Sequence, residues 1–405
     1  MIERRIYLDK IIEFIDKPFV KVLTGIRRSG KSTVLLMITQ VLQKQGVETN
    51  QIIYINLESF ANAHLDTPQA LYQYVTNIVP KGKRCYLLVD EIQEIMGWEK
   101  AINSLNVDYD IDIYITGSNA HLLSSELATF LAGRYIEFHI YPLSFEEYLQ
   151  FKTARGIAIE SNYNEFDYFL RMGGFPVLHT SNYTEETAYK IVYDIYSSVI
   201  LRDTIQRNNI RDLELLERVV KFVFDNIGNK FSGKNVADYF KSQQRKIDLN
   251  TVYNYLKALE SAFIIHRVSR YDVKGKEILK TQEKFYAADT ALIYSVMGYK
   301  DRLIAGILEN IVLLELKRRG YDVYVGKSDQ LEIDFIATKS NQSLYIQVSY
   351  LLAEESTIKR EFNPLLEIKD NYPKYVVTMD RFWKENIDGV KHIHVADFLL
   401  LKEYI

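Results

Sequence analysis

The sequence predicts an α/β protein that begins with a parallel sheet covered by helices on both faces. Two observations support this fold class. Apolar segments with the length of strands alternate with helical segments through the first 119 residues, and a glycine-rich turn joins the first strand to a helix. Strands that are apolar along most of their length are typical of parallel sheets, because both faces of such a sheet are buried.

The expected strands and helices alternate regularly. In chain order, helices are predicted over residues 7–16, 32–45, 68–79 and 98–105, and strands over residues 19–23, 52–56, 85–91 and 111–119. Helical spacing of apolar residues supports the first helix, and Gly46 ends the second. Helices between successive strands are the connection that a parallel sheet requires.

The first strand is followed by a loop that fits the pattern G-x-x-x-x-G-K-[ST]. The loop and the start of the next helix are Gly25-Ile26-Arg27-Arg28-Ser29-Gly30-Lys31-Ser32-Thr33. Such glycines let consecutive backbone N–H groups surround a polyphosphate, and the helix N-terminus adds partial positive charge. Lys31 is expected to reach the β- and γ-phosphates, and the Ser32 hydroxyl to hold Mg²⁺. The residues predicted to bind a nucleoside triphosphate are Gly25, Arg28, Ser29, Gly30, Lys31, Ser32 and Thr33.

Two acids, Asp90 and Glu91, end the third predicted strand. The aspartate can bind the water shell of Mg²⁺, and the glutamate can accept a proton from the attacking water. The alternative is a solvated acidic loop behind a core strand. Ser118 and Asn119 follow the next strand, where either could hydrogen-bond the water or the γ-phosphate, although this segment could equally form a simple turn. We therefore predict Asp90 as a metal ligand together with the loop serine, and Glu91 as the base.

The composition is that of an ordinary globular protein. Hydrophobic residues make up 47% and charged residues 25% of the chain, which leaves ample material for cores. The single cysteine, Cys85, excludes an internal disulfide and a cysteine-based zinc site. The amino terminus is charged, and no window holds ~18 uninterrupted apolar residues, so neither a signal peptide nor a membrane span is expected. We expect a cytoplasmic protein.

Several motifs together resemble a prokaryotic branch of the AAA+ ATPases. They are Gly25 to Thr33, Val89-Asp90-Glu91-Ile92-Gln93, Thr116-Gly117-Ser118-Asn119, Ala132-Gly133-Arg134 and Tyr141-Pro142-Leu143-Ser144-Phe145-Glu146-Glu147-Tyr148. The resemblance covers nearly the whole chain, and in that family a C-terminal domain of unknown function usually follows the ATPase. It implies a P-loop NTPase sheet of the AAA+ type with a helical lid, and ATP with Mg²⁺ as ligands. ATP is favoured over GTP by this resemblance, because the chain lacks a guanine-reading N-K-x-D loop after the last core strand.

The resemblance also singles out Arg134 as a catalytic residue. An arginine presented to the γ-phosphate, from the same or a neighbouring subunit, accelerates related phosphoryl transfers by ~10³–10⁵. The alternative is a surface arginine that pairs with Glu137 or Glu126. Arg28, inside the phosphate loop, has a similar ambiguity.

Residues 156–228 are expected to form the helical lid that follows the sheet in AAA+ proteins. The segment contains Gly173-Gly174-Phe175-Pro176, which predicts a break between helices, and a strongly periodic stretch from Val192 to Arg207. Arg202 or Arg207 could sense the nucleotide, or both could be solvated charges.

Residues 229–280 are expected to form a winged helix. The predicted helices and strand lie over residues 235–240, 248–259 and 263–268. Residues 230–280 hold eleven lysines and arginines against five acids, a local charge of about +6 in a chain of net charge −3. Thr251, Asn254 and Lys257 share the exposed face of the second helix, which makes DNA contact physically reasonable. Winged helices also serve as packing or protein-contact modules, so both roles stay open.

Residues 281–405 resemble the α/β fold of restriction-type nucleases, in which paired carboxylates hold Mg²⁺ and a lysine orients water. Glu309 and Asp334 occupy the acidic positions, but Gln347 and Ser349 stand in place of the second carboxylate and the lysine. An amide is a weaker ligand for a hard cation, and serine supplies no positive charge. The sequence therefore favours a degenerate, structural domain over an active nuclease.

The predicted domains are an ATPase core over 1–155, a lid over 156–228, a winged helix over 229–280 and a nuclease-like domain over 281–405. The predicted function is Mg²⁺-dependent ATP hydrolysis that drives a conformational change. The alternatives are a nucleotide-switched DNA-binding or regulatory protein with little turnover, and a metal-dependent nuclease. Besides ATP, the partners left open are DNA, through residues 230–280, and a second copy of the chain, whereas no membrane contact is expected.

Overall fold

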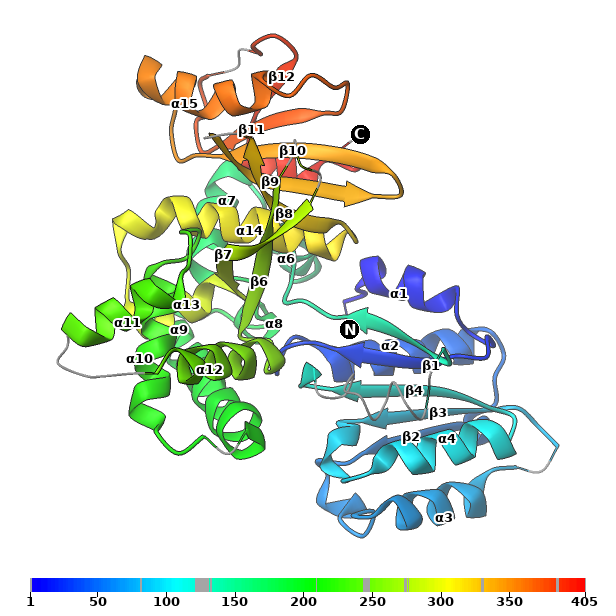
Figure 1. Ribbon diagram of the computed structural model, residues 1–405. Helices are drawn as coiled ribbons and strands as arrows, with labels where there is room; N and C mark the ends of the chain where they lie inside the picture. Colours follow the sequence, from blue (N-terminus) through cyan, green and yellow to red (C-terminus); the bar gives the residue numbers. More distant parts are fainter. Residues whose placement is uncertain are drawn as a thin grey trace. The chain divides into compact units, whose positions relative to one another are not determined.

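The computed structural model describes residues 2–80, 82–120, 131, 133–208, 210–242, 248–272, 275, 277–328, 331–383 and 386–404. The chain divides into two units, and most of their helices and strands are labelled in Figure 1. The first comprises Met1–Tyr141 with Ser261–Phe263, and the second comprises Pro142–Glu260 with Ile264–Ile405. Each unit is built around its own sheet.

The sheet of the first unit is parallel throughout. Its strands are β1 (Val20–Thr24), β2 (Ile52–Asn56), β3 (Cys85–Asp90), β4 (Ile111–Gly117) and β5 (Tyr135–His139). They lie in the order β2-β3-β4-β1-β5, and every neighbouring pair is parallel. β1 therefore lies in the interior of the sheet, between β4 and β5.

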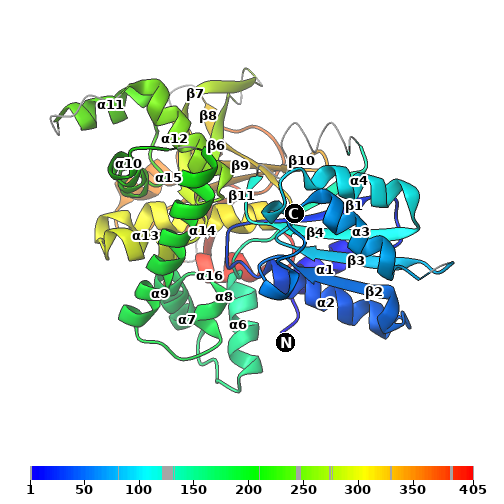
Figure 2. The same cartoon turned by 90° about the horizontal axis from the view of Figure 1, so that it is seen from below.

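Helices cover both faces of this sheet, as Figure 2 shows. On one face lie α1 (Arg5–Ile12) and α2 (Lys31–Lys44), and on the other lie α3 (Pro68–Ile78) and α4 (Trp98–Asp108). Short 3-10 turns η1 (Thr49–Gln51), η2 (Phe60–Asn62) and η3 (Ile92–Glu94) complete the described connections. The sheet is thus the middle of three layers.

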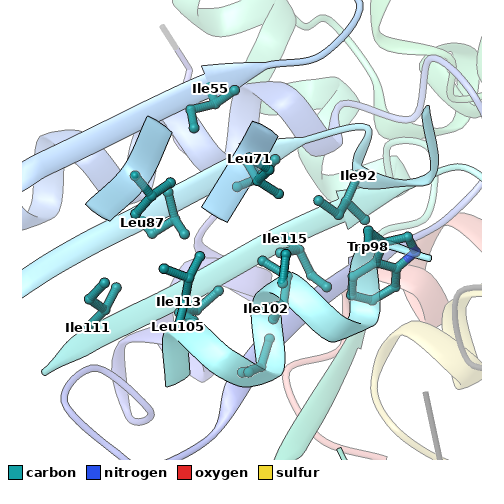
Figure 3. Packing of buried hydrophobic residues seen from close by; sticks show 14 of the residues in the cluster. Ile55, Leu71, Leu87, Ile92, Trp98, Ile102, Leu105, Ile111, Ile113 and Ile115 are labelled. Carbon is teal, nitrogen blue, oxygen red and sulfur yellow. The ribbon is translucent and has the colours of Figure 1, made fainter. Parts of the chain in front are cut away.

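Alternation along the strands divides the apolar side chains between two cores. Leu87 and Val89 of β3 belong to the core under α3 and α4, whereas Tyr86 and Leu88 belong to the core under α1 and α2. Successive strand residues face opposite sides of a sheet, so a strand covered on both faces must be apolar along its length. Figure 3 shows the first of these cores, in which both helices pack on strand residues such as Ile113.

The predicted α/β class and parallel sheet are confirmed. The four strands predicted in the first 119 residues are present, and one of them, β2, has the predicted bounds. The largest difference is in the first helix, which was expected over 7–16 and runs from Arg5 to Ile12. Helix ends depend on capping and packing more than on apolar spacing, which explains the shift.

The second unit begins with helices. In chain order they are α6 (Phe145–Ala154), α7 (Asn162–Met172), α8 (Pro176–His179), α9 (Glu185–Ser198), the π-helical η5 (Val199–Gln206), α10 (Leu213–Asp225), α11 (Gly233–Ser242) and α12 (Leu249–Ser261). The predicted break falls between α7, whose C-cap is Gly173, and α8, which begins at Pro176.

A mixed sheet completes the second unit, with the strand order β12-β11-β10-β9-β8-β6-β7. Its strands are β6 (Ile265–Asp272), β7 (Glu277–Ala287), β8 (Asp322–Ser328), β9 (Leu331–Lys339), β10 (Gln342–Val348), β11 (Lys374–Thr378) and β12 (Val390–His394). The accompanying helices are α13 (Thr290–Met297), η6 (Asp301–Leu303), α14 (Ile304–Arg318), α15 (Glu355–Leu366) and α16 (Val395–Leu400). The ribbon expected as a wing is β6 and β7, which form one side of this sheet, so the boundary predicted at residue 280 lies inside β7.

Within the described residues, no helix has both the length and the apolar character that crossing a bilayer requires.

Candidate functional site

The segments predicted to carry the chemistry lie along one edge of the first sheet. Parallel pairing aligns Thr24 of β1 with Gly117 of β4, and Asn56 of β2 with Asp90 of β3. The residues that follow these four strands therefore meet at the carboxyl edge, in the order β2-β3-β4-β1. Open α/β sheets bind their ligands in the crevice outside this edge.

The loop after β1 has backbone angles that glycine permits. Gly25 has a φ of 140°, and a Cβ atom there would lie 2.2 Å from the carbonyl oxygen of Ile140. Gly30 has a φ of 100° and forms the N-cap of α2. Arg28 adopts a φ of 66° although it is not glycine, and its side chain is exposed. The result is a tight backbone turn that closes onto a helix N-terminus, the arrangement that presents N–H groups to a phosphate.

A buried arginine from the amino end of the chain supports this loop. Arg4 is 2% exposed and donates hydrogen bonds to the carbonyl oxygens of Ser29, at 2.7 Å, and Tyr141, at 2.9 Å. A guanidinium can serve two acceptors because its donors form a rigid fork. Arg4 therefore ties the loop to the segment that follows β5.

Lys31 lies inside the loop. Its ammonium donates hydrogen bonds to the carbonyl oxygens of Gly25, at 3.0 Å, and Ile26, at 3.3 Å. The same nitrogen is 3.6 Å from Oε1 of Glu91, and the lysine side chain is only 3% exposed. The lysine predicted to bind phosphate and the glutamate predicted as the base are therefore neighbours.

Asp90 is buried at the end of β3 and accepts hydrogen bonds from three hydroxyl groups. Thr116 Oγ1 donates to Oδ1 at 2.5 Å, Tyr54 donates to Oδ2 at 3.3 Å, and the Ser32 hydroxyl also hydrogen-bonds the carboxylate. Burial raises the pKa of Asp90, and the bonds from Thr116 and Ser32 oppose this rise. The two residues predicted to hold the metal are thus in contact, and a hydroxyl with a carboxylate fits the preference of Mg²⁺ for oxygen ligands.

Glu91 adopts a φ of 57°, in the left-handed region that is uncommon for residues other than glycine. Its N–H donates to Thr116 Oγ1 at 2.9 Å, and its carboxylate accepts a hydrogen bond from the amide of Gln93. Burial favours the neutral acid, but Lys31 and Gln93 outweigh burial and hold the pKa of Glu91 below its ordinary value. The side chain is therefore ionised at neutral pH, as a general base must be.

The other residues predicted around the phosphate also lie at this edge. Ser118 and Asn119 are fully buried directly after β4. The Gln93 amide, which bonds Glu91, lies 3.4 Å from Ser118 Oγ and donates to it. Thr33 is half-buried in the first turn of α2. The structure thus brings Ser118 into one hydrogen-bonded group with the predicted base.

Arg134, in contrast, lies at the opposite edge of the sheet. Its carbonyl oxygen accepts a hydrogen bond from the N–H of Val20, the first residue of β1, at 2.8 Å. β1 has five residues, and at ~3.3 Å per residue it separates Arg134 from the phosphate loop by roughly 16 Å. This placement argues against action within the same subunit. Action on a neighbouring subunit stays a prediction, and Glu126, one of the two alternative partners, lies outside the described residues.

The sequence did not indicate a role for Arg4, Tyr54, Gln93 or Thr116. Thr116 and Gln93 belong to the motifs that carry the family resemblance, and their positions beside the two acids were the available signal. Arg4 gave no signal, because its two acceptors are 25 and 137 residues away in sequence.

The acids predicted for a nuclease-like centre also come together, around a lysine. The ammonium of Lys284 lies 3.2 Å from Oε2 of Glu309, 3.3 Å from Oδ1 of Asp334 and 3.1 Å from Oε1 of Glu332. The Tyr286 hydroxyl donates to Glu309 at 2.8 Å. Burial and then the neighbouring Asp334 raise the pKa of Glu309 to about 8, although Lys284 opposes the rise. A lysine ammonium thus takes the central position among these carboxylates.

Gln347 and Ser349 both make backbone hydrogen bonds beside this second centre, and the Gln347 side chain also hydrogen-bonds Glu361. Gln347 Oε1 accepts a hydrogen bond from the N–H of Asp334 at 3.1 Å, and the N–H of Ser349 donates to the carbonyl of Val377 at 3.0 Å. Among the described residues, no group of three histidines, cysteines or acids is arranged to hold a metal ion.

Two further predicted features lie in the helical part of the second unit. Asn254 and Lys257 of α12 are exposed, and Thr251 is half-buried. Arg207 lies 3.6 Å from Asp203 one helical turn away, while the side chain of Arg202 lies outside the described part of the chain. This ion pair within one helix gives the guanidinium of Arg207 an anionic partner that is not a nucleotide.

Two family models match the chain. An AAA domain matches residues 17–149, and a domain of unknown function matches residues 163–303. The first match contains the phosphate loop, the acids Asp90 and Glu91, and all five strands of the first sheet.

Relatives and solved structures resemble most of the chain. It is 40% identical over 404 residues to a Haemophilus influenzae protein described as uncharacterized, and the match covers 99% of both chains. It is 31% identical over 395 residues to an uncharacterized protein of Methanocaldococcus jannaschii, covering 92% of this chain and 86% of that protein. The Walker-type ATPase of Pyrococcus abyssi superposes with a TM-score of 0.52 at 16% identity, over 73% of this chain and 96% of that chain. At that identity, the structural likeness shows a shared fold.

Proposed function

Because the chain belongs to a prokaryotic family of AAA+ ATPases in which a domain of unknown function follows the AAA domain, we propose that it binds ATP with Mg²⁺ and hydrolyses it to drive a conformational change. The observation that supports this most strongly is the convergence of Lys31, Asp90 and Glu91 at the carboxyl edge of the first sheet. These are the charges that phosphoryl transfer requires: a cation for phosphate, an oxygen ligand for the metal and a base for water.

Binding is the task of the loop and the start of α2. The backbone N–H groups of residues 25–30 and the ammonium of Lys31 hold the β- and γ-phosphates. Ser32 and Asp90 would hold Mg²⁺, which when bound neutralises negative charge on the phosphates. Both supply oxygen atoms, and they already share a hydrogen bond.

Hydrolysis is the task of the residues after β3 and β4. Glu91 accepts a proton from the attacking water while the bond between the γ-phosphorus and the bridging oxygen breaks, which leaves ADP and phosphate. Ser118 and Asn119 orient the water or the γ-phosphate from the neighbouring strand. Both are buried, so their side chains are held in place before substrate arrives.

Two substitutions separate binding from turnover. Lys31→Ala removes the phosphate contact and is expected to abolish tight ATP binding in isothermal titration calorimetry. Glu91→Gln keeps the size of the side chain but removes the proton acceptor. It is expected to bind ATP within a few-fold of wild type and to release phosphate at least ~10²-fold more slowly.

Lys44→Ala is the matched control, because Lys44 lies at the other end of α2 and its side chain is 73% exposed. It is expected to leave both measurements unchanged. Wild-type turnover by Glu91→Gln would remove Glu91 as the base, and wild-type affinity of Lys31→Ala would remove the loop as the binding site.

A nucleotide-switched DNA-binding or regulatory protein is the second candidate, favoured by the basic residues of the segment 230–280. This segment holds eleven lysines and arginines against five acids, and Asn254 and Lys257 are exposed on α12. Retention of the full chain on duplex DNA at rising salt, with and without ATP, tests this candidate. Phosphate contacts give a slope of about −0.9 each in a log–log plot, and a slope near zero would eliminate DNA as a partner.

The proposal also assigns a role to each of the four predicted domains. Residues 1–155 act as the ATPase core, although their last helix, α6, belongs to the second unit, and 156–228 act as its lid. Residues 229–280 act as a winged helix whose ribbon is also part of the mixed sheet, and 281–405 act as a nuclease-like domain without catalysis. The last assignment is supported by Lys284, because a buried lysine that already neutralises the carboxylates competes with any metal ion for them.

A further inference from the structure

Besides Lys31 and Arg28, the phosphate loop carries a third cation, Arg27, at a position where the loop pattern accepts any residue. Its guanidinium forms an ion pair with the carboxylate of Glu58, and the arginine side chain is 16% exposed. Arg27 is half-buried within the loop, whereas its neighbour Arg28 is exposed to solvent.

Glu58 belongs to a segment that is fixed to the ends of β2 and β3. Its N–H donates to the Asn56 side chain at 2.9 Å, and the N–H of Leu57 donates to the carbonyl of Asp90 at 3.1 Å. The Asn62 amide donates to the carbonyl of Asn56 at 2.8 Å and closes the turn. The same turn contains Phe60, whose ring is 94% exposed. The acid that holds Arg27 is thus placed by the strand next to the Asp90-Glu91 pair.

We propose that Arg27 leaves Glu58 and binds the terminal phosphate when a nucleoside triphosphate enters the loop. A terminal phosphate carries more negative charge than a carboxylate and matches the arginine fork in the same bidentate way, so it is the stronger partner. Glu58 then competes with the nucleotide for Arg27. When the nucleotide binds, the loss of this ion pair changes the contacts of residues 57–62. This inference rests on the proposed ATP-binding function and adds a residue that distinguishes triphosphate from diphosphate.

The proposal predicts effects of opposite sign for the two partners. Glu58→Gln removes the competitor, and since a partly exposed ion pair is weak, affinity for a non-hydrolysable ATP analogue is expected to rise roughly two- to fivefold. Arg27→Ala removes a charge-assisted contact to phosphate, and affinity is expected to fall by roughly 10- to 100-fold. Affinity for ADP is expected to stay within about twofold in both variants, because ADP lacks the terminal phosphate.

The experiment is calorimetric titration of the full chain with the ATP analogue and with ADP, for wild type, both single variants and the double variant. The double variant is expected to match Arg27→Ala, because Glu58 has nothing to compete for once the arginine is absent. Glu48→Gln is the control, since Glu48 pairs with Lys83 at 2.8 Å on the exposed surface of the same unit. Arg27→Lys is expected to recover part of the affinity that Arg27→Ala loses, and thermal melting establishes that each variant is folded.

The alternative is an ion pair that only stabilises the fold. In that case Glu58→Gln and Arg27→Ala would weaken binding equally or leave it unchanged, or ADP would be affected as strongly as the ATP analogue, and each of these results would overturn the proposal. Failure of the wild-type chain to bind either nucleotide would instead refute the proposed function itself, so the two failures are distinguishable.

Discussion

The hydroxyl of Thr116 connects the two acids of the proposed ATP site. It donates to Asp90 at 2.5 Å and accepts from the N–H of Glu91 at 2.9 Å, and Thr116 is fully buried. Thr116→Val leaves a buried N–H and a buried carboxylate each without this partner. We predict a loss of ~1–3 kcal/mol in the free energy of unfolding and a higher Mg²⁺ concentration for half-maximal ATP hydrolysis.

Thr39→Val is the control for this prediction. The Thr39 hydroxyl donates to the carbonyl of Leu35 in its own helix at 3.3 Å, so its removal should cost little. Chemical denaturation and a Mg²⁺ titration of phosphate release measure the two effects. A Thr116→Val protein with wild-type stability and wild-type Mg²⁺ dependence would show that the hydroxyl does not position the acids.

Another buried acid, Asp289, makes the stability of the chain depend on pH. It accepts hydrogen bonds from the backbone N–H groups of Gly174, at 2.7 Å, and Ala291, at 2.9 Å. Burial, opposed by these bonds, raises the pKa of Asp289 from 3.8 to about 7. Since the folded state binds this proton more tightly than the unfolded state, the stabilisation is complete below pH ~4 and is lost as the pH rises through about 7.

We therefore predict that the free energy of unfolding falls by ~4 kcal/mol between pH 4 and pH 8 because of this residue. Asp289→Asn removes this titration and should make this part of the profile less steep, leaving the slope that Glu309 contributes through its own raised pKa. It also lowers stability overall by placing an amide N–H₂ against a backbone donor. The exposed Asp238, on α11, supplies the control Asp238→Asn. Denaturant titrations across this pH range measure the slopes, and equal slopes for Asp289→Asn and wild type would contradict the assignment.

At the scale of secondary-structure elements, the turn between α7 and α8 depends on glycine for space as well as for backbone angle. Gly173 has a φ of 65°, and a Cβ atom there would lie 1.9 Å from Oδ1 of Asp289. Gly298 caps α13 with a φ of 68° and has no atom within 4 Å of the same position. The two glycines have nearly the same φ and differ in the space available to a Cβ atom.

This pair gives a matched test. Gly298→Ala is expected to cost ~1–3 kcal/mol of stability, the strain of a backbone conformation that only glycine adopts readily. Gly173→Ala should cost that amount plus the displacement of Asp289 from its two backbone donors, a further ~2 kcal/mol or more. Equal losses in chemical denaturation would mean that Asp289 moves aside without cost.

How much the sequence could predict depends on how far apart in the chain the residues that form each feature lie. The strands and the loop with Lys31 are local patterns, and parallel pairing then brings the acids after β3 to that loop, so this part was accessible. Arg4 supports the loop through acceptors 25 and 137 residues away, which no local pattern encodes. In the second unit, the sequence marked Ser349 as the place of a missing cation, whereas Lys284 supplies the cation from β7, 25 and 50 residues from Glu309 and Asp334.

At the scale of the whole molecule, the position of Arg134 bears on assembly. Its exposed side chain lies at the amino edge of the first sheet, one strand length from the phosphate loop of its own chain. A second copy could present the same arginine to that loop, whereas its own chain cannot do so without unravelling β1. We therefore predict that Arg134→Ala keeps ATP binding and loses ~10³-fold or more in turnover, which is the usual contribution of such an arginine to the hydrolysis rate.

Mixing two inactive variants tests whether this arginine acts between subunits. Lys31→Ala subunits bind no ATP but retain Arg134, and Arg134→Ala subunits bind ATP but lack the arginine. If the site is shared, a mixture of the two regains measurable phosphate release, because some interfaces join an intact loop to an intact arginine. A non-hydrolysable ATP analogue is then also expected to increase the measured mass of the wild-type protein. A mixture as inactive as its components, together with a chain that stays monomeric with the analogue, would leave Arg134 as a surface residue and confine the chemistry to one subunit.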